Sequence, residues 1–186
     1  MHLEEALSSK MDIKAFILDM DGLLFDSERI VQRSWEMAGD ELGIPHMGDV
    51  IYHTLGMNRT GRNEYFRKYI REDFPFEEFG KLTRDNFWKI VDKEGLPLKK
   101  GAKELLAYGK SQGYKMAVAT SSSREYAMGN LIRAGIDSYF DSVVCGDMVK
   151  KAKPDPEIYQ KACESLGIQP EYCMAFEDAP GGILSA

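Results

Sequence analysis

Four short apolar segments, each stopped abruptly by polar residues, constrain this chain more than any other feature. Such segments are typical of strands in a parallel sheet, where covering helices hide both faces of every strand. Amphipathic helical patterns lie between the segments, so strands and helices alternate along the chain. We therefore expect an α/β fold with a Rossmann-like parallel sheet and helices on both faces. The expected strands are residues 13–18, 115–119, 142–145 and 172–176.

A long interval separates the first expected strand from the second. Thr120 follows Asp21 by 99 residues, whereas a strand, a crossover helix and the next strand need roughly 30. The excess predicts an inserted module, and its apolar residues recur at helical spacing, with helices expected at 58–71 and 76–91. The expected domains are a core of residues 1–27 and 99–186 and an α-helical cap of residues 28–98.

Charge and cysteine content argue against several classes of protein. Basic residues number 24 and acidic residues 30, so the net charge is −6, and no basic field exists to bind nucleic acid. Three scattered cysteines are too few for a disulfide framework, and no leader-like or membrane-spanning apolar stretch is present. We expect a cytoplasmic protein that binds neither nucleic acid nor membranes.

Asp19 and Asp21 follow the first expected strand, in the sequence Asp-Met-Asp-Gly. Two carboxylates at the end of a buried strand are costly unless a cation meets them. A polar turn alone would also explain so short a motif. The ends of the other strands supply further polar groups, and parallel strands bring such ends together. These groups are Thr120, Lys153 and the pair Glu177 and Asp178.

Taken together, these segments resemble the haloacid dehalogenase-like hydrolases, and among them the β-phosphoglucomutase-like and phosphoglycolate phosphatase-like group with a helical cap. They occur in the order of that family, and the likeness extends from about Ile13 to the last residue. Four motifs at compatible separations are more specific than any single one. The matching segments are Asp19-Met-Asp-Gly-Leu-Leu-Phe-Asp-Ser27, Met116-Ala-Val-Ala-Thr-Ser-Ser122, Lys153-Pro-Asp-Pro-Glu-Ile-Tyr159 and Phe176-Glu-Asp-Ala-Pro-Gly-Gly-Ile183.

The resemblance implies roles for the acidic residues. Asp19 would be the nucleophile that becomes an aspartyl phosphate, and Asp21 would be the general acid and base. Asp19 and Asp178 would ligate Mg²⁺ together with the backbone carbonyl of residue 21, because hard oxygen ligands suit this ion. Glu177 would lie just outside, although which of Glu177 and Asp178 contacts the metal stays open.

The resemblance also implies a set of phosphate-binding residues. Thr120 would donate a hydrogen bond to a phosphate oxygen, and Lys153 would balance the charge. Ser121 and Ser122 would offer backbone amides where a helix begins. Gly22 would form the tight turn that lets the backbone approach the phosphate. Taken singly, residues 120–123 could be only a helix cap and Lys153 only a solvated lysine.

Two further positions bear on the substrate. The segment Gly56-Met-Asn-Arg59 resembles one that presents an arginine to the substrate in this group, so Arg59 would contact a distal phosphate or hydroxyl; an arginine on the helix surface is the alternative. The mutase members carry a histidine one turn after the position matched by Ser27, where this chain has Val31. Val31 favours a hydrolase over a hexose-phosphate mutase.

The C-terminal end departs from the family pattern. Eight residues follow Asp178, whereas the family continues through further elements. We therefore expect a chain truncated at its C-terminus, natural or not. Strand 172–176 would then be an open edge, which lowers stability and favours aggregation.

The sequence thus predicts a Mg²⁺-dependent phosphatase that hydrolyses a small phosphorylated metabolite, such as a sugar phosphate, through an aspartyl-phosphate intermediate. A sugar-phosphate mutase of the β-phosphoglucomutase type is the runner-up. Two alternatives of another class stay open. One is a phospho-accepting receiver-like signalling module, against which the large insertion argues, and the other is an inactive fragment.

Overall fold

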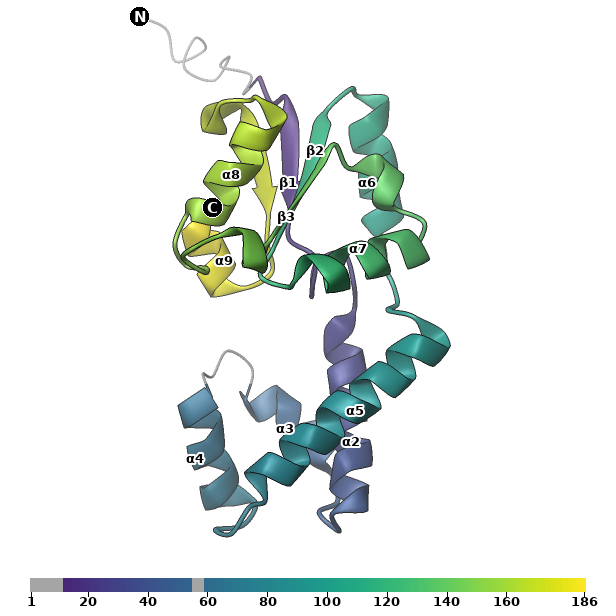
Figure 1. The fold of residues 1–186 in the computed structure, drawn as a ribbon, viewed down its shortest axis with the longest axis vertical. Coiled ribbons are helices and arrows are strands. Elements are labelled where there is room, and N and C mark those ends of the chain that lie inside the picture. The colour runs from purple at the N-terminus through teal and green to yellow at the C-terminus, as the bar shows by residue number, and fades with distance from the viewer. Residues whose placement is uncertain (1–11, 55–58) are drawn as a thin grey trace, which may run out of the picture. The chain divides into compact units, whose positions relative to one another are not determined.

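The computed structural model describes residues 12–54 and 59–186 (Figure 1). The chain divides into two compact units. The core unit runs up to Phe25 and resumes with Leu98–Ala186, and the helical unit is Asp26–Pro97. The helical unit is therefore an insertion between the first strand of the core and the rest of it.

The core unit is built on a parallel sheet. Its strands are β1 (Ala15–Leu18), β2 (Lys115–Thr120), β3 (Ser142–Cys145) and β4 (Cys173–Phe176), in the spatial order β3-β2-β1-β4. Leu18 of β1 pairs with Val118 of β2 and with Phe176 of β4, so the carboxyl ends of these strands lie side by side. The expected Rossmann-like parallel sheet is confirmed, although β1 begins at Ala15 rather than at residue 13.

Helices cover both faces of this sheet. They are α6 (Ala102–Ser111), α7 (Arg124–Arg133), α8 (Glu157–Leu166) and α9 (Pro180–Ser185), with 3-10 turns at Asp137–Tyr139, Gly146–Met148 and Pro170–Tyr172. Successive side chains of a strand point to opposite faces. Ile17 accordingly belongs to the apolar cluster under α8, whereas its neighbour Phe16 lies against Gly109 of α6. Figure 1 shows α6 and α8 on opposite sides of the sheet.

The helical unit has an apolar core of its own. Its helices are α2 (Ser27–Glu41), α3 (Met47–Thr54), α4 (Arg59–Tyr69) and α5 (Phe76–Glu94). The rings of Trp35, Phe66 and Phe79, from three different helices, lie at the centre of its apolar cluster. The sequence did not predict α3. That helix has eight residues and includes Gly48, a poor helix former, so its pattern is too short to show a helical period.

The chain enters and leaves the helical unit at adjacent points. The N–H of Asp26 donates to the carbonyl of Pro97 at 2.8 Å. The guanidinium of Arg33 donates two hydrogen bonds, of 2.7 and 2.8 Å, to the carboxylate of Glu94. This bidentate pair ties the first helix of the unit to its last, so the insertion is closed on itself.

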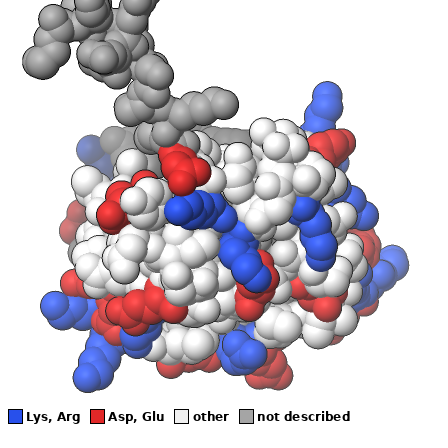
Figure 2. All heavy atoms as spheres, turned by 90° about the horizontal axis from the view of Figure 1, so that it is seen from above, with Lys and Arg blue, Asp and Glu red and all other residues white. Residues whose placement is uncertain are grey.

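The surface and the cysteines add two findings. Among the described residues, no helix is long and apolar enough to cross a membrane. On the face shown in Figure 2, basic and acidic side chains are interspersed, so that face presents no field of one sign. All three cysteines are free thiols, and the Sγ atoms of Cys163 and Cys173 lie 3.7 Å apart.

Candidate active site

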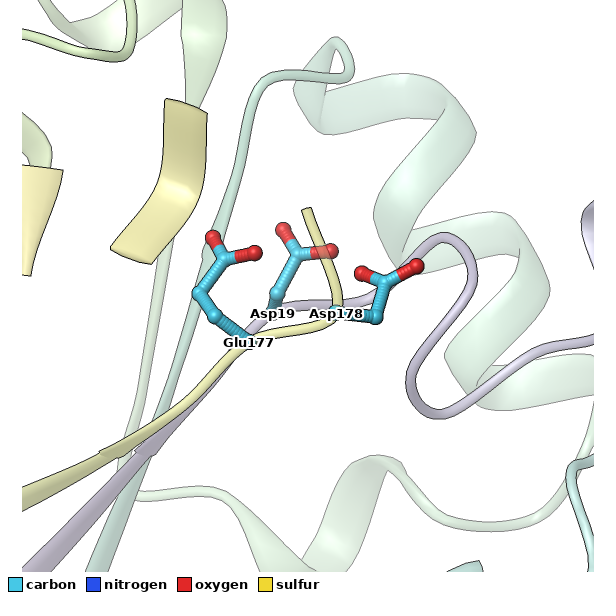
Figure 3. Close-up of side chains that lie close together, drawn as sticks. All are labelled: Asp19, Glu177 and Asp178. Carbon is cyan, nitrogen blue, oxygen red and sulfur yellow. The ribbon is translucent and has the colours of Figure 1, made fainter. Parts of the chain in front are cut away.

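Acidic side chains gather where β1 and β4 end. Asp19 directly follows β1, and Glu177 and Asp178 directly follow β4. The N–H of Asp19 donates to the carbonyl of Phe176 at 3.0 Å, so the pairing of the two strands continues up to the cluster. One carboxylate oxygen from each acid lies within 4.8 Å of the others, and Figure 3 shows the three carboxyl groups extending to the same side of the strand ends.

Burial of this cluster disfavours negative charge. Asp19 is 8 % exposed, and its burial raises its pKa to about 6, against the opposing effect of Lys153. Burial and the nearby Glu177 also raise the pKa of Asp178. A carboxylate cluster whose charged form is disfavoured calls for cationic partners.

Lys153 supplies one positive charge inside the cluster. Its ammonium donates to Asp19 Oδ1 at 2.7 Å, to the carbonyl of Ala119 at 3.0 Å and to Glu177 Oε1. The side chain is 11 % exposed. The solvated-lysine alternative is therefore wrong: Lys153 is held between two carboxylates at the sheet edge.

Tyr159 of α8 was missed by the sequence reasoning. Its hydroxyl donates to Glu177 Oε1 at 2.7 Å, and its ring centroid lies 5.1 Å from the ammonium of Lys153. Burial, followed by the bond to Glu177, raises the pKa of this tyrosine. Glu177 Oε1 thus accepts hydrogen bonds from both Lys153 and Tyr159. Tyr159 lies within the motif that begins at Lys153, but nothing in that spacing shows where its hydroxyl points.

Asp21 is held separately from the three clustered acids. Its Oδ2 accepts a hydrogen bond from Ser122 Oγ at 2.8 Å, and its Oδ1 accepts one from Tyr126 OH at 3.1 Å. We expected Ser122 to offer its backbone amide to phosphate; in the structure that N–H donates to Thr120 Oγ1 at 3.2 Å, and the hydroxyl of Ser122 is engaged with Asp21. Tyr126, in the first turn of α7, was not predicted, because the contact depends on how α7 packs beside the β1 loop.

The segment that follows β2 differs in part from expectation. Thr120 is 1 % exposed, and its Oγ1 accepts a bond from the N–H of Ser122 at 3.2 Å. The helix starts at Arg124, and Ser123 is its N-cap, whose side chain accepts from the N–H of Tyr126. The prediction that the helix begins at Ser121 and Ser122 is thus two residues early, and Ser121 is exposed in the turn before it.

The loop that carries Lys153 is anchored by Glu157. The Glu157 carboxylate accepts the N–H groups of Lys150 at 3.0 Å and Lys151 at 2.9 Å. These bonds lower the pKa of Glu157 to about 2. Asp155 Oδ1 accepts from the N–H of Glu157 at 3.0 Å, so it ties the loop to the start of α8, whose N-cap residue is Pro156.

Two expectations concern the helical unit. Residues 56–58 and the side chain of Arg59 lie outside the described part of the structure, so the expected substrate contact of Arg59 stays a prediction. Val31 is part of α2 and packs against the apolar cluster of the helical unit. At this position, where the resemblance would place a histidine in a mutase, the chain therefore has a packing residue.

The donor set fits a divalent cation. One ammonium cannot balance three carboxylates, and Glu177 is already bonded to Lys153 and Tyr159. Carboxylate oxygens are hard ligands of the kind that Mg²⁺ prefers. Asp19 and Asp178 are therefore the residues that could hold such an ion, with Glu177 orienting Lys153.

Gly22 lies in the turn beside this cluster, where the side chain of Asp178 comes close to the backbone. It has a φ of +83°, and a Cβ at this position would overlap the Oδ2 of Asp178 and lie 2.9 Å from its Cγ. Only a residue without a side chain fits both the backbone conformation and the close approach of Asp178.

Gly22→Ala should therefore lower the free energy of unfolding by about 1 to 3 kcal/mol, because the left-handed backbone and the overlap with Asp178 both oppose a methyl group. Urea denaturation measures this loss. Gly129→Ala is the matched control, since Gly129 lies within α7 and a Cβ there meets no atom within 4 Å. Equal stability of the two variants would contradict the close approach.

The comparisons with known proteins agree with one another. A family profile described as haloacid dehalogenase-like hydrolase matches residues 13–186. The phosphorylated carbohydrates phosphatase of Thermotoga maritima is 33% identical, over 94% of this chain and 80% of that protein. Hexitol phosphatase A of Escherichia coli is 30% identical, over 94% and 79%. A solved structure from Thermotoga maritima, provisionally named a beta-phosphoglucomutase, has a TM-score of 0.77 and 31% identity, over 93% of this chain and 80% of that one.

Proposed function

The chain belongs to the haloacid dehalogenase-like hydrolase family, and from that membership we propose that it is a Mg²⁺-dependent phosphatase of small phosphorylated metabolites. The observation that carries the proposal is the buried Asp19, paired with Lys153 and clustered with Glu177 and Asp178, while a second carboxylate, Asp21, is held apart. Two differently placed carboxylates suit a reaction that needs both a nucleophile and an acid.

In the proposed reaction, Asp19 attacks the phosphorus atom and the bond from phosphorus to the leaving oxygen breaks. Asp21 gives its proton to that oxygen, so the alcohol leaves neutral. Asp21 then accepts a proton from the attacking water, the bond between phosphorus and Asp19 breaks, and inorganic phosphate is released. Splitting the displacement in two lets the same pair of carboxylates serve both halves.

Charge balance is the main task of the other residues. A phosphomonoester dianion repels Asp19 until positive charge meets both. Lys153, already bonded to Asp19, provides part of it, and the hydroxyl of Thr120 at the end of β2 would donate to a phosphate oxygen. Bound Mg²⁺, held by Asp19 and Asp178, would supply further charge stabilisation.

A sugar phosphate is the proposed class of substrate. Relatives of this chain bear the names of phosphatases of phosphorylated carbohydrates and of hexitol. The apolar Val31, packed in the helical unit, supports hydrolysis over mutase chemistry. The mutase remains the second candidate because a solved structure 31% identical to this chain carries a provisional beta-phosphoglucomutase name.

Phosphate release from a panel of phosphomonoesters tests the proposal. The panel holds hexitol and hexose phosphates, phosphoglycolate and an aryl phosphate, each with Mg²⁺, with a chelator, and with Mg²⁺ restored after the chelator. We expect release that requires Mg²⁺ and is fastest on a sugar phosphate. Chromatography of the sugar phosphates runs in parallel, because isomerisation without net release would identify the mutase. A folded chain that binds Mg²⁺ but turns over nothing would contradict both.

A further inference from the structure

Two of the three cysteines lie in contact with each other in the core unit. Cys163 is in α8, and Cys173 is the first residue of β4, 10 positions further along the chain. Their Sγ atoms are 3.7 Å apart, and the S–H of Cys163 donates to the sulfur of Cys173. A disulfide bond holds two sulfur atoms at about 2.05 Å, so these two thiols are already neighbours that such a bond could join.

Packing holds both members of this pair in place. Cys163 is 6 % exposed and belongs to the apolar cluster that α8 forms with the sheet, and Cys173 packs against the same cluster. The S–H of Cys173 donates to the carbonyl of Gln169 at 3.5 Å, in the segment that leads from α8 to β4. Each thiol therefore stays beside the other, which gives the pair a high effective concentration for a reaction between them.

The third cysteine has a different place in the sheet. Cys145 is the last residue of β3 and is fully buried. The strand order β3-β2-β1-β4 puts β3 and β4 at opposite edges of the sheet. Two strands therefore separate Cys145 from Cys173, and the fold favours Cys163 as the partner of Cys173.

A pocket of about 380 Å³ gives small molecules a route to the pair. It lies in the core unit, along the end of α8 and the turn after it, and Cys163 and Gln169 are among its lining residues. Cys173 is half-buried. A small reagent can therefore reach this place while the sheet and its covering helices stay packed.

We propose that Cys163 and Cys173 are a site of reversible disulfide formation, oxidised by low-molecular-weight disulfides such as glutathione disulfide. The sulfur of Cys173 attacks one sulfur of the small disulfide, whose S–S bond breaks and releases the first small thiol. The sulfur of Cys163 then attacks Cys173, which forms the protein S–S bond and releases the second small thiol. Each protein thiol gives up one proton and each departing thiolate takes one up, while two electrons pass from the protein to the small disulfide.

The hydrogen bond between the thiols determines which of them attacks first. Burial raises the pKa of Cys173, and the bond that Cys163 donates to it opposes that rise. Burial, followed by the same bond, raises the pKa of Cys163 to about 12. Cys173 is also the more exposed of the two, so it is the attacking thiol and Cys163 resolves the mixed disulfide. Because both thiols are mainly protonated at neutral pH, the exchange is slow.

The bond would join two elements that already meet at the carboxylate cluster. Tyr159 lies one turn before Cys163 on the same face of α8, and its hydroxyl donates to Glu177, which directly follows β4. Cys163 and Cys173 meet where β4 begins. A disulfide there adds a covalent connection between α8 and β4 and closes a short loop. The oxidised chain should therefore unfold at a higher urea concentration than the reduced chain.

Incubation with glutathione followed by mass spectrometry tests the site. The folded protein is held with sub-millimolar reduced and oxidised glutathione, quenched with acid, alkylated in denaturant and digested with trypsin. Cys163 and Cys173 fall in one tryptic peptide, residues 162–186, whereas Cys145 falls in residues 134–150. A second digestion after Glu164 separates the first two cysteines unless a disulfide joins them.

We expect the peptide of residues 162–186 to lose two hydrogen atoms and to stay joined after the second digestion. The linked form should exceed the glutathione adduct at least about tenfold, because the neighbouring thiol outcompetes dilute glutathione. The peptide of residues 134–150 should remain alkylated at Cys145.

Two variants locate the reaction. Cys163→Ala should accumulate a glutathione adduct on Cys173, because the resolving thiol is missing. Cys145→Ala is the matched control: it removes a buried thiol at the opposite edge of the sheet and should form the link to the same extent as the unmodified protein. Oxidation should raise the urea midpoint of the unmodified protein and of Cys145→Ala, and should not raise that of Cys163→Ala. Near-ultraviolet circular dichroism verifies that each variant is folded.

A glutathione adduct on the unmodified protein as abundant as on Cys163→Ala, or a link that involves Cys145, would overturn the proposal. Refolding from urea in the same glutathione mixture removes any limit that access to the folded chain imposes. Absence of the link by both routes would therefore also contradict it. No step measures phosphate release, so failure here leaves the proposed hydrolysis untouched.

Discussion

Asp19→Asn is expected to abolish phosphate release, with a loss of at least about 10³-fold, because an amide cannot replace the carboxylate as nucleophile. The shape of the side chain is retained, and the amide oxygen can still accept the hydrogen bond that Lys153 donates at 2.7 Å. The measurement is the rate of Mg²⁺-dependent release on the best substrate of the panel. Mass spectrometry of acid-quenched reactions should find a phosphoryl group on the peptide with Asp19 in the unmodified protein only.

Asp12→Asn is the control for Asp19→Asn. It makes the same chemical change at an exposed residue outside the carboxylate cluster. Asp12 lies shortly before β1, its side chain is 74% exposed, and it pairs with Lys14 at 3.3 Å. The Asp12→Asn variant should release phosphate at the same rate as the unmodified protein. Substantial activity in folded Asp19→Asn, or a phosphoryl group on another peptide, would show that a different residue is the nucleophile.

The second large effect is on stability. Lys153→Met should lower the free energy of unfolding by about 3 kcal/mol, because it leaves Asp19 and Glu177 buried together without their shared ammonium. The lysine and both acids have side chains no more than 11% exposed, so solvent cannot replace the lost charge. Urea denaturation in the presence of a chelator measures the change, and phosphate release should also fall because Asp19 loses a neutralising partner.

Lys151→Met is the control from the same loop. The Lys151 side chain is 73% exposed and lies 3.4 Å from Asp155, and exposed ion pairs of this kind contribute at most about 1 kcal/mol. Added Mg²⁺ should restore part of the stability of Lys153→Met, since a cation at the carboxylates offsets the missing ammonium. If both lysine variants unfold at the same urea concentration, the buried pairs do not stabilise the fold.

Much of the fold could be predicted because its signals are local. Each strand is a run of apolar residues long enough to be recognised, and the polar residues that follow mark its carboxyl end. In a parallel sheet all such ends meet at one edge, so the proximity of Asp19, Thr120 and Glu177 follows from strand order alone. The helical insertion could be predicted from local signals too. The interval between the first two strands is longer than a crossover needs, and its apolar residues recur at helical spacing. The helix α3 escaped notice because eight residues hold too little periodicity.

The contacts that orient the carboxylates could not be predicted. Tyr126 and Tyr159 lie on helices, and which carboxylate each hydroxyl meets depends on how far that helix is shifted and rotated against the sheet. The hydroxyl of Ser122 turned out to bond Asp21, and Gly22 to be needed by the approach of Asp178. The hydrogen bond from Tyr126 to Asp21 alone joins residues 105 positions apart, and no periodicity in the chain encodes such contacts.

The sequence by itself therefore determined the layered parallel sheet, the inserted helices and the set of chemical groups at the strand ends, because hydrophobic spacing and strand direction are properties of short segments. Only the tertiary structure decided that Lys153 bridges Asp19 and Glu177 and that Asp21 is held apart by Ser122 and Tyr126. These features arise when elements distant in the chain pack together. Packing depends on the shapes of all the side chains at once.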